Sequence, residues 1–159
     1  MIKFICTESE QQAGIRAAEI MAEVIKTRPN ALIGLATGST PLNMYAELVK
    51  KYSIGELSFR DVKTVNLDEY VGLSQTHEQS YYWFMWKNLF SHIDIKPENT
   101  HLPTGASLDP EKECINYDRL LDRLGREDIQ LLGIGHNGHI AFNDPWVADF
   151  KDTKKVKVV

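Results

Sequence analysis

Reactive side chains gather in three short turns of this 159-residue chain, and each turn follows an apolar run typical of a β-strand. The turns are GLATGSTP at residues 34–41, NLDEYVGL at 66–73 and GIGHNGHIAFNDP at 133–145. In an open α/β sheet, ligands bind beyond the carboxyl ends of the strands. We therefore expect the functional residues to come from these turns.

The first turn has the composition of an anion site. Thr37, Gly38, Ser39 and Thr40 precede Pro41, a residue type favoured at the first position of a helix. Backbone N–H groups, hydroxyl donors and the positive end of the helix dipole would together hold a phosphate group. The plain alternative is that Ser39 or Thr40 caps the helix and Gly38 turns the chain. The turn is not a nucleotide-binding Walker loop, because no Lys follows its glycine.

The second turn places two neighbouring carboxylates, Asp68 and Glu69, at the end of an apolar strand. Like charges that are partly removed from water repel each other, which raises the pKa of one of them and suits a general base. The alternative is that both are solvated loop acids. The position at the end of a strand favours the functional interpretation.

The third turn is shaped by glycines and presents polar groups that include His136, Asn137, His139, Asn143 and Asp144. A histidine with a carboxylate five positions on, as in His139 and Asp144, can be oriented through one ring nitrogen and exchange protons through the other. We therefore expect acid–base chemistry at this turn.

Two other interpretations of the third turn are weaker. Residues 133–138 spell GxGxxG, but lysines at 154–155 stand where a dinucleotide site has an acidic residue, so we expect no nicotinamide cofactor. The two histidines of the turn are three positions apart and lack a third ligand at helical or hairpin spacing. We therefore expect no metal.

Composition limits the classes of partner. The chain has 18 Lys and Arg against 22 Asp and Glu, a net charge of −4, which argues against nucleic-acid binding. The basic stretch at 151–159 is more typical of a solvated edge. No segment approaches the roughly 20 apolar residues of a membrane span, and the N-terminus does not look like a signal peptide. Cys6 and Cys114 lie far apart in sequence, as expected of reduced, buried thiols in a cytoplasmic protein.

Alternating strand and helix patterns predict one α/β domain over 1–159, an open and mostly parallel sheet with helices on both faces. We expect strands at residues 2–5, 31–36, 62–67, 129–135 and 156–159. A first helix should begin after a capping box at 7–10 and end before Pro29, and further helices are expected at 41–52, 78–91 and 110–124. Because the last strand has no helix after it, we interpret the chain as truncated at its C-terminus, the N-terminal part of a longer domain.

The aromatic run SYYWFMW at residues 80–86 could in principle stack nucleic-acid bases. Base stacking needs interleaved basic residues, and only Lys87 is near. Core packing or a subunit interface is the better interpretation, which allows a homo-oligomer.

Taken together, the three turns and the SYYWFM segment resemble the glucosamine-6-phosphate deaminase/isomerase family, in the right order and over essentially the whole chain. The resemblance implies a Rossmann-like fold and a cytoplasmic enzyme acting on a small sugar phosphate. The implied reaction converts a 2-amino-2-deoxyhexose 6-phosphate to a ketohexose 6-phosphate with loss of ammonia, by acid–base catalysis without a cofactor.

The resemblance also implies roles for particular residues. Asp68 would be the base that moves a proton between carbons 2 and 1 of the sugar through an enolamine. His139 would assist ring opening, with Asp144 orienting it. The turn at 37–40 would hold the phosphate.

Two positions depart from the family pattern. Asn137 stands where the family usually has Asp, and Asp144 where it usually has Glu. Asn137 removes a carboxylate that would stabilise the imidazolium, and it looks more like the galactosamine-6-phosphate isomerase branch. We therefore expect galactosamine-6-phosphate to be turned over at least as well as glucosamine-6-phosphate.

The resemblance further implies that family members continue past residue 159 and supply an Arg and a Lys that clamp the phosphate. We expect residues 1–159 alone to have little or no activity. The rival functions are a 6-phosphogluconolactonase-like esterase and a non-catalytic sugar-phosphate-binding protein. Asp68 in its Asp-Glu-Tyr setting and the AFNDP sequence at 141–145 favour the isomerase.

Overall fold

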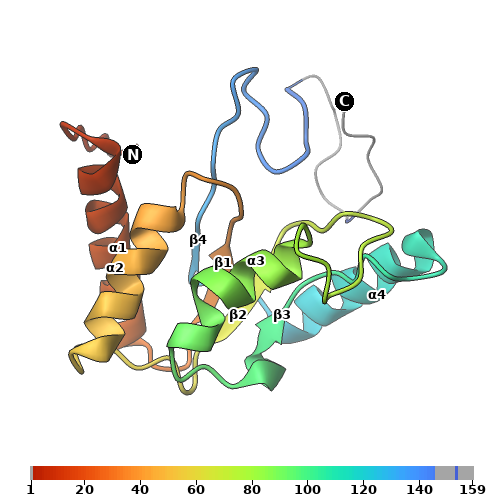
Figure 1. Cartoon of the computed structure of the whole chain (residues 1–159), viewed down its shortest axis with the longest axis horizontal. Helices are drawn as coiled ribbons and strands as arrows, with labels where there is room; N and C mark the ends of the chain where they lie inside the picture. The colour runs from red at the N-terminus through yellow and green to blue at the C-terminus, as the bar shows by residue number, and fades with distance from the viewer. Residues whose placement is uncertain (1, 146–152, 154–159) are drawn as a thin grey trace.

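Four short parallel strands form the centre of the computed structural model, which describes residues 2–145 and 153. They are β1 (Leu32–Leu35), β2 (Lys63–Asn66), β3 (Thr100–His101) and β4 (Ile129–Gln130). Their order is β3-β2-β1-β4 (Figure 1). The chain thus adds β2 and β3 on one side of β1 and returns to place β4 on the other. The topological switch point, where such sheets bind ligands, lies between β1 and β4.

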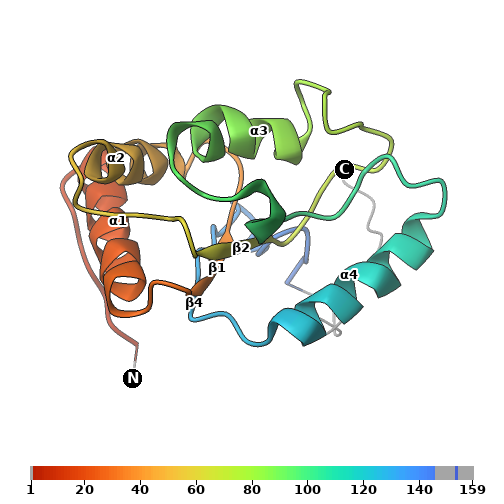
Figure 2. The same cartoon turned by 90° about the horizontal axis from the view of Figure 1, so that it is seen from below.

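In the described part of the chain, four α-helices cover the sheet: α1 (Glu10–Thr27), α2 (Leu42–Ser53), α3 (Tyr81–Asn88) and α4 (Pro110–Leu124). Helices α3 and α4 lie on opposite sides of the strands (Figure 2). Two short 3₁₀ helices, Phe90–His92 and Pro97–Asn99, connect α3 to β3. The prediction of a parallel sheet with helices on both faces is confirmed.

The main core packs α1, α2 and α3 against the strands. Its largest fully buried side chains include Met21, Ile33, Tyr45, Phe59 and Phe90. Burying each such side chain contributes roughly 1.5–3 kcal/mol of unfolding free energy.

Close backbone contact and a buried hydroxyl position the outer helices. A Cβ atom at Gly14 would collide with Asn43, so glycine is needed for α1 and α2 to approach. On the other face, the Tyr117 hydroxyl of α4 donates to the carbonyl oxygen of Asn66 at 2.7 Å and lies 3.2 Å from that of His101. This contact ties α4 to the ends of β2 and β3.

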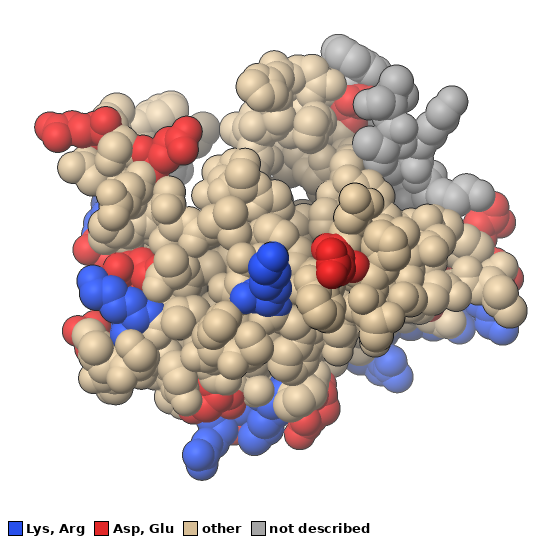
Figure 3. All heavy atoms as spheres, in the orientation of Figure 1, with Lys and Arg blue, Asp and Glu red and all other residues tan. Residues whose placement is uncertain are grey.

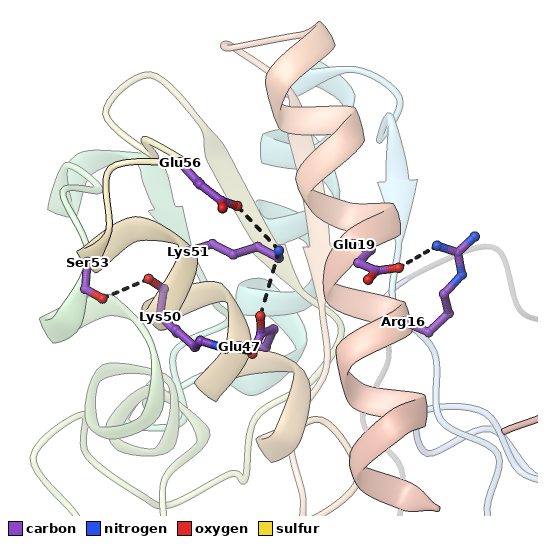
Figure 4. Close-up of polar contacts among 7 residues, drawn as sticks. All are labelled: Arg16, Glu19, Glu47, Lys50, Lys51, Ser53 and Glu56. Carbon is purple, nitrogen blue, oxygen red and sulfur yellow. Dashed lines mark hydrogen bonds and ion pairs between the residues drawn. The ribbon is translucent and has the colours of Figure 1, made fainter. Parts of the chain in front are cut away.

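Charged side chains lie mostly toward the left and lower edges of the face drawn in Figure 3, with few over its centre. On α2, Lys51 lies 3.8 Å from Glu47 and 3.5 Å from Glu56, and on α1 Arg16 pairs with Glu19 (Figure 4). Surface pairs of this kind contribute about 0–1 kcal/mol each. The buried apolar interface, rather than these ion pairs, therefore holds α1 against α2.

The start of the chain differs from the prediction. Residues 2–5 form no strand, and the side chains of Ile2 and Phe4 are 80% and 86% exposed. The first helix is capped by Ser9, whose Oγ accepts the Gln12 N–H at 3.2 Å, rather than by the box predicted at 7–10. An alternating apolar pattern makes a strand only where a neighbouring strand can pair with it. Cys6, expected to be buried, is exposed, and Cys114 is partly buried; both are free.

Other elements have different boundaries in the structure from those predicted. The strand predicted at 129–135 ends at Gln130, and the helix predicted at 78–91 begins only after Ser80, whose Oγ accepts the Trp83 N–H at 3.0 Å. Strand β3 is two residues long, too short for any periodicity to reveal. The strand expected at 156–159 lies outside the described residues.

Candidate active site

A pocket of about 210 Å³ opens at the carboxyl ends of β1, β2 and β4, at the switch point of the sheet. Each of the three turns contributes to its lining: Thr37 and Thr40 follow β1, Asp68 follows β2, and His139 follows β4. The segments after β1 and β4 leave the sheet at the same end (Figure 1). Parallel topology has therefore brought together groups that are about 100 positions apart in sequence.

The side chain of Tyr45 on α2 anchors the turn after β1. The fully buried Tyr45 hydroxyl donates to the carbonyl oxygen of Ala36 and accepts the Ala36 N–H at 3.2 Å. Gly38 has a φ of 94°, which favours glycine, and lies in open space. Among the pocket-lining residues the turn supplies Thr37 and Thr40, whereas Gly38 and Ser39 lie outside the pocket lining.

The start of α2 has no side-chain cap within the described residues. Pro41 precedes the helix in a helical conformation, with φ −79° and ψ −7°, and the first N–H group, that of Leu42, donates to the backbone carbonyl oxygen of Ser39 at 3.3 Å. A side-chain cap from Ser39 or Thr40, the plain alternative for this turn, is therefore not seen there. The N–H groups of the first turn that have no side-chain partner, and the helix dipole, suit an anion.

The two carboxylates after β2 have separate environments. Asp68 is half-buried and lines the pocket, and burial, helped by the charge of Glu69, raises its pKa to about 6. Glu69 accepts the backbone N–H groups of Tyr70, Tyr81 and Tyr82 at 2.8, 2.9 and 2.9 Å. Asp68 is thus the carboxylate available for chemistry, while Glu69 holds the N-terminus of α3.

An aromatic cluster joins the second and third turns. The ring centroids of Tyr70 and Tyr81 are 4.8 Å apart, and Phe142 stacks on Tyr81 with the planes 8° apart at 6.3 Å. Tyr81 also lines the pocket, where burial raises the pKa of its phenol and the Asp68 and Tyr70 side chains add to the shift. Sequence reasoning assigned this tyrosine to packing, because the aromatic run gives no sign of which ring meets the pocket.

Glycines shape the turn after β4. Gly138 has a φ of 86° and donates its N–H to the carbonyl oxygen of Gly135 at 2.9 Å, and the Gly135 N–H in turn donates to the carbonyl oxygen of His139 at 2.8 Å. A Cβ atom at Gly135 would collide with the His139 ring. The glycines of the GxGxxG pattern therefore allow a tight turn in which the His139 ring packs against the backbone at Gly135.

The polar side chains of this turn form a chain of contacts. The Nδ1 atom of His139 lies 2.7 Å from Oδ1 of Asn137, and the Asn137 Nδ2 group donates to Asp144 at 3.0 Å. Asp144, predicted to orient His139, reaches it through the amide. His136 is exposed and outside the pocket lining, and Asn143 pairs with Ile140.

Within residues 2–145 and 153, no three His, Cys, Asp or Glu side chains lie close enough to hold a metal ion. No helix in the same ranges is long and apolar enough to cross a membrane.

A pocket at the switch point of a parallel sheet defines an open α/β protein of the kind in which ligands bind beyond the carboxyl ends of the strands. Residues 7–154 match the sequence model of the glucosamine-6-phosphate isomerases/6-phosphogluconolactonase family. The chain belongs to this family, as its three turns predict.

Curated relatives agree. Proteins named glucosamine-6-phosphate deaminase are 53% identical over 144 residues in Clostridioides difficile (strain 630) and 50% identical over 157 residues in Lachnoclostridium phytofermentans. These alignments cover 91% and 99% of this chain, but only 57% and 66% of the relatives. The chain therefore spans less than two thirds of the length of the curated relatives it matches.

Solved structures give the same fold. A structure described as a monomeric glucosamine-6-phosphate deaminase superposes with a TM-score of 0.90 at 45% identity, over 92% of this chain and 61% of its own. The 6-phosphogluconolactonase from Thermotoga maritima superposes with a TM-score of 0.72 at 22% identity, over 87% of this chain and 62% of its own. The second likeness establishes the fold alone.

Proposed function

We propose that this chain carries the acid–base site of an enzyme that converts an amino-sugar 6-phosphate and water to a ketohexose 6-phosphate and ammonia. The observation that carries the proposal is the meeting of Asp68, His139 and the turn after β1 on one pocket. The relatives named glucosamine-6-phosphate deaminase, at about half identity, support the same reaction.

Asp68 is the proposed base. With a pKa raised to about 6 it is mostly ionised at neutral pH yet basic enough to accept a proton from carbon. In the open-chain sugar it takes the hydrogen of carbon 2, leaving an enolamine, and returns that proton to carbon 1. The resulting ketimine adds water and expels ammonia to give the ketose.

His139 is the proposed group for ring opening. A neutral imidazole can accept the proton of the anomeric hydroxyl through one nitrogen. As the bond between carbon 1 and the ring oxygen breaks to form the aldehyde, the imidazolium can give that proton to the ring oxygen. The contacts through Asn137 to Asp144 orient the imidazole from the side of Nδ1.

The proposed phosphate site is the turn at 37–40 with the uncapped start of α2. Backbone N–H groups and the hydroxyls of Thr37, Ser39 and Thr40 supply neutral donors there, and the helix dipole adds a partial positive charge. Holding the phosphate here would place the far end of the sugar chain toward Asp68 and His139.

Which amino sugar is the substrate, and whether the enzyme is a deaminase or a lactonase, are two separate questions. Asn137 motivates galactosamine-6-phosphate as a substrate at least as good as glucosamine-6-phosphate, whereas the names of the relatives favour the gluco epimer. The lactonase alternative is supported by the family description, which includes 6-phosphogluconolactonase, and by fold likeness at 22% identity. The relatives named glucosamine-6-phosphate deaminase, at about half identity, favour the deaminase over it.

The test is release of ammonia and ketohexose 6-phosphate from both amino sugars, measured beside hydrolysis of 6-phosphogluconolactone. Because the chain spans less than two thirds of its relatives, the same assays are run on the chain joined to the C-terminal third of one relative. Equal yields of ammonia and ketose, lost in Asp68→Asn, would support the proposal. Lactone hydrolysis without ammonia, or binding without turnover in both proteins, would refute it.

A further inference from the structure

The side chain of Asn137 lies between His139 and Asp144 in the turn after β4. Its Oδ1 atom lies 2.7 Å from Nδ1 of His139 and also accepts the backbone N–H of His139 at 3.1 Å. Its Nδ2 group donates to Oδ1 of Asp144 at 3.0 Å. The amide is therefore held at both ends.

These partners fix which end of the amide carries the oxygen. A backbone N–H group can only donate, so the atom of Asn137 that it meets is the carbonyl oxygen. An ionised carboxylate can only accept, so the atom that meets Asp144 is the amide nitrogen. The two assignments agree, and neither uses the state of the histidine ring.

An amide oxygen has no proton to give, so the ring nitrogen that faces it must carry one. Neutral imidazole has a single N–H, and placing it on Nδ1 leaves the lone pair on Nε2. We propose that Asn137 is a positioning residue that holds neutral His139 in the Nδ1–H tautomer, and that Asp144 acts on His139 through the Asn137 amide. The assignment of the free Nε2 to ring opening rests on the proposed function; the tautomer itself does not.

The chemistry of an amide differs here from that of a carboxylate. A carboxylate at position 137 would accept the same Nδ1 proton, but it would add a negative charge that stabilises the imidazolium and repels Asp144. An amide fixes the orientation and the tautomer of the ring without that charge. The other ionisable groups near the ring are Asp68 and Tyr81, which line the pocket with it, and the exposed His136 on its own turn.

Nitrogen-15 NMR of the imidazole rings tests the proposal on the protein without substrate. The signals of His139 are assigned by their loss in His139→Gln. In spectra of the neutral ring we expect Nδ1 to show the shift of a protonated nitrogen and Nε2 that of an unprotonated one. This measurement needs no variant of Asn137 to fold.

Two variants then connect the tautomer to the amide. In Asn137→Ala the ratio of the Nδ1–H to the Nε2–H form should fall about tenfold, the value of one neutral hydrogen bond. In Asn137→Asp the Nδ1–H form should persist, because a carboxylate also accepts the Nδ1 proton. The matched control is Asn143→Ala, which removes an amide of the same turn whose Nδ2 contacts the Ile140 carbonyl oxygen, and it should leave the ratio unchanged.

An Nε2–H ring in the unaltered protein, or an unchanged ratio in Asn137→Ala, would overturn the proposal. Loss of the Nδ1–H form in Asn137→Asp would also contradict it, because a carboxylate accepts the same proton. An Nδ1–H ring, together with no ammonia release by the chain joined to the C-terminal third of one relative, would support the tautomer assignment while counting against the proposed function.

Discussion

Glu69 accepts the backbone N–H of Tyr81 at 2.9 Å, and through this contact the end of β2 is joined to the start of α3. The contact also explains why two adjacent acids differ. Both acids lie just beyond the end of β2 at Asn66, where Glu69 reaches the helix N-terminus while Asp68 lines the pocket. Burial raises the pKa of Asp68, and the negative charge of Glu69 raises it further.

Glu69→Gln should weaken the contact between the end of β2 and the start of α3, and it should lower the pKa of Asp68. The amide keeps an acceptor oxygen but loses the charge that favours a helix N-terminus, so we expect a loss of about 1–2 kcal/mol in unfolding free energy. The pKa of Asp68 should fall below about 6, because the second cause of its rise is removed. Carbon-13 NMR titration of the Asp68 carboxyl and chemical denaturation measure both effects. Glu78→Gln, the same change at an exposed acid nearby, is the control, and equal effects in the two variants would contradict the role of Glu69.

Ionisation of Asp68 should lower the unfolding free energy of the protein as pH rises. Its pKa is about 6 in the folded protein, against about 3.9 for an unperturbed Asp. The folded state therefore holds the proton more tightly, and unfolding free energy is lost between about pH 4 and pH 6, by roughly 2–3 kcal/mol. Asp68→Asn should remove this loss, so the variant should gain stability over the unaltered protein across that window. If the unfolding free energies of the two proteins changed with pH in the same way, burial would not raise the pKa of Asp68.

The sequence predicts what depends on local pattern. Apolar runs, glycines and capping residues predict the three turns, the capped start of α4 at Pro110 and, to within one residue, the strand ends at Leu35 and Asn66. What could not be predicted depends on contacts between distant segments. The binding of Glu69 to the amides of α3 and the stacking of Phe142 on Tyr81 need the tertiary structure.

Gly135→Ala should disturb His139 directly. The added Cβ atom collides with the ring, so the ring must move, with an overpacking cost of about 1–3 kcal/mol in unfolding free energy. Gly133→Ala is the matched control, because a Cβ atom there meets nothing within 4 Å. Denaturation and the NMR shifts of the His139 ring report the effect, and a ring left unmoved by Gly135→Ala would contradict the close packing.

His139→Gln should separate ring opening from the later proton transfer. If His139 acts on the closed sugar, the variant should lose more turnover on the cyclic substrate than on an open-chain analogue. The expected loss on the cyclic sugar is about 10²–10⁴-fold, as for removal of a general acid–base group. Equal losses on both substrates would place His139 in a different step.

Asp68 is the proposed base that moves the proton between carbons 2 and 1. The rate of ammonia release from glucosamine- and galactosamine-6-phosphate is measured for the chain joined to the C-terminal third of one relative, with and without Asp68→Asn, and the affinity for the sugar phosphate is measured in parallel. We expect Asp68→Asn to lower the rate by about 10²–10⁴-fold while affinity is kept, because the phosphate is held at the turn after β1. Turnover by Asp68→Asn close to that of the unaltered protein would contradict it.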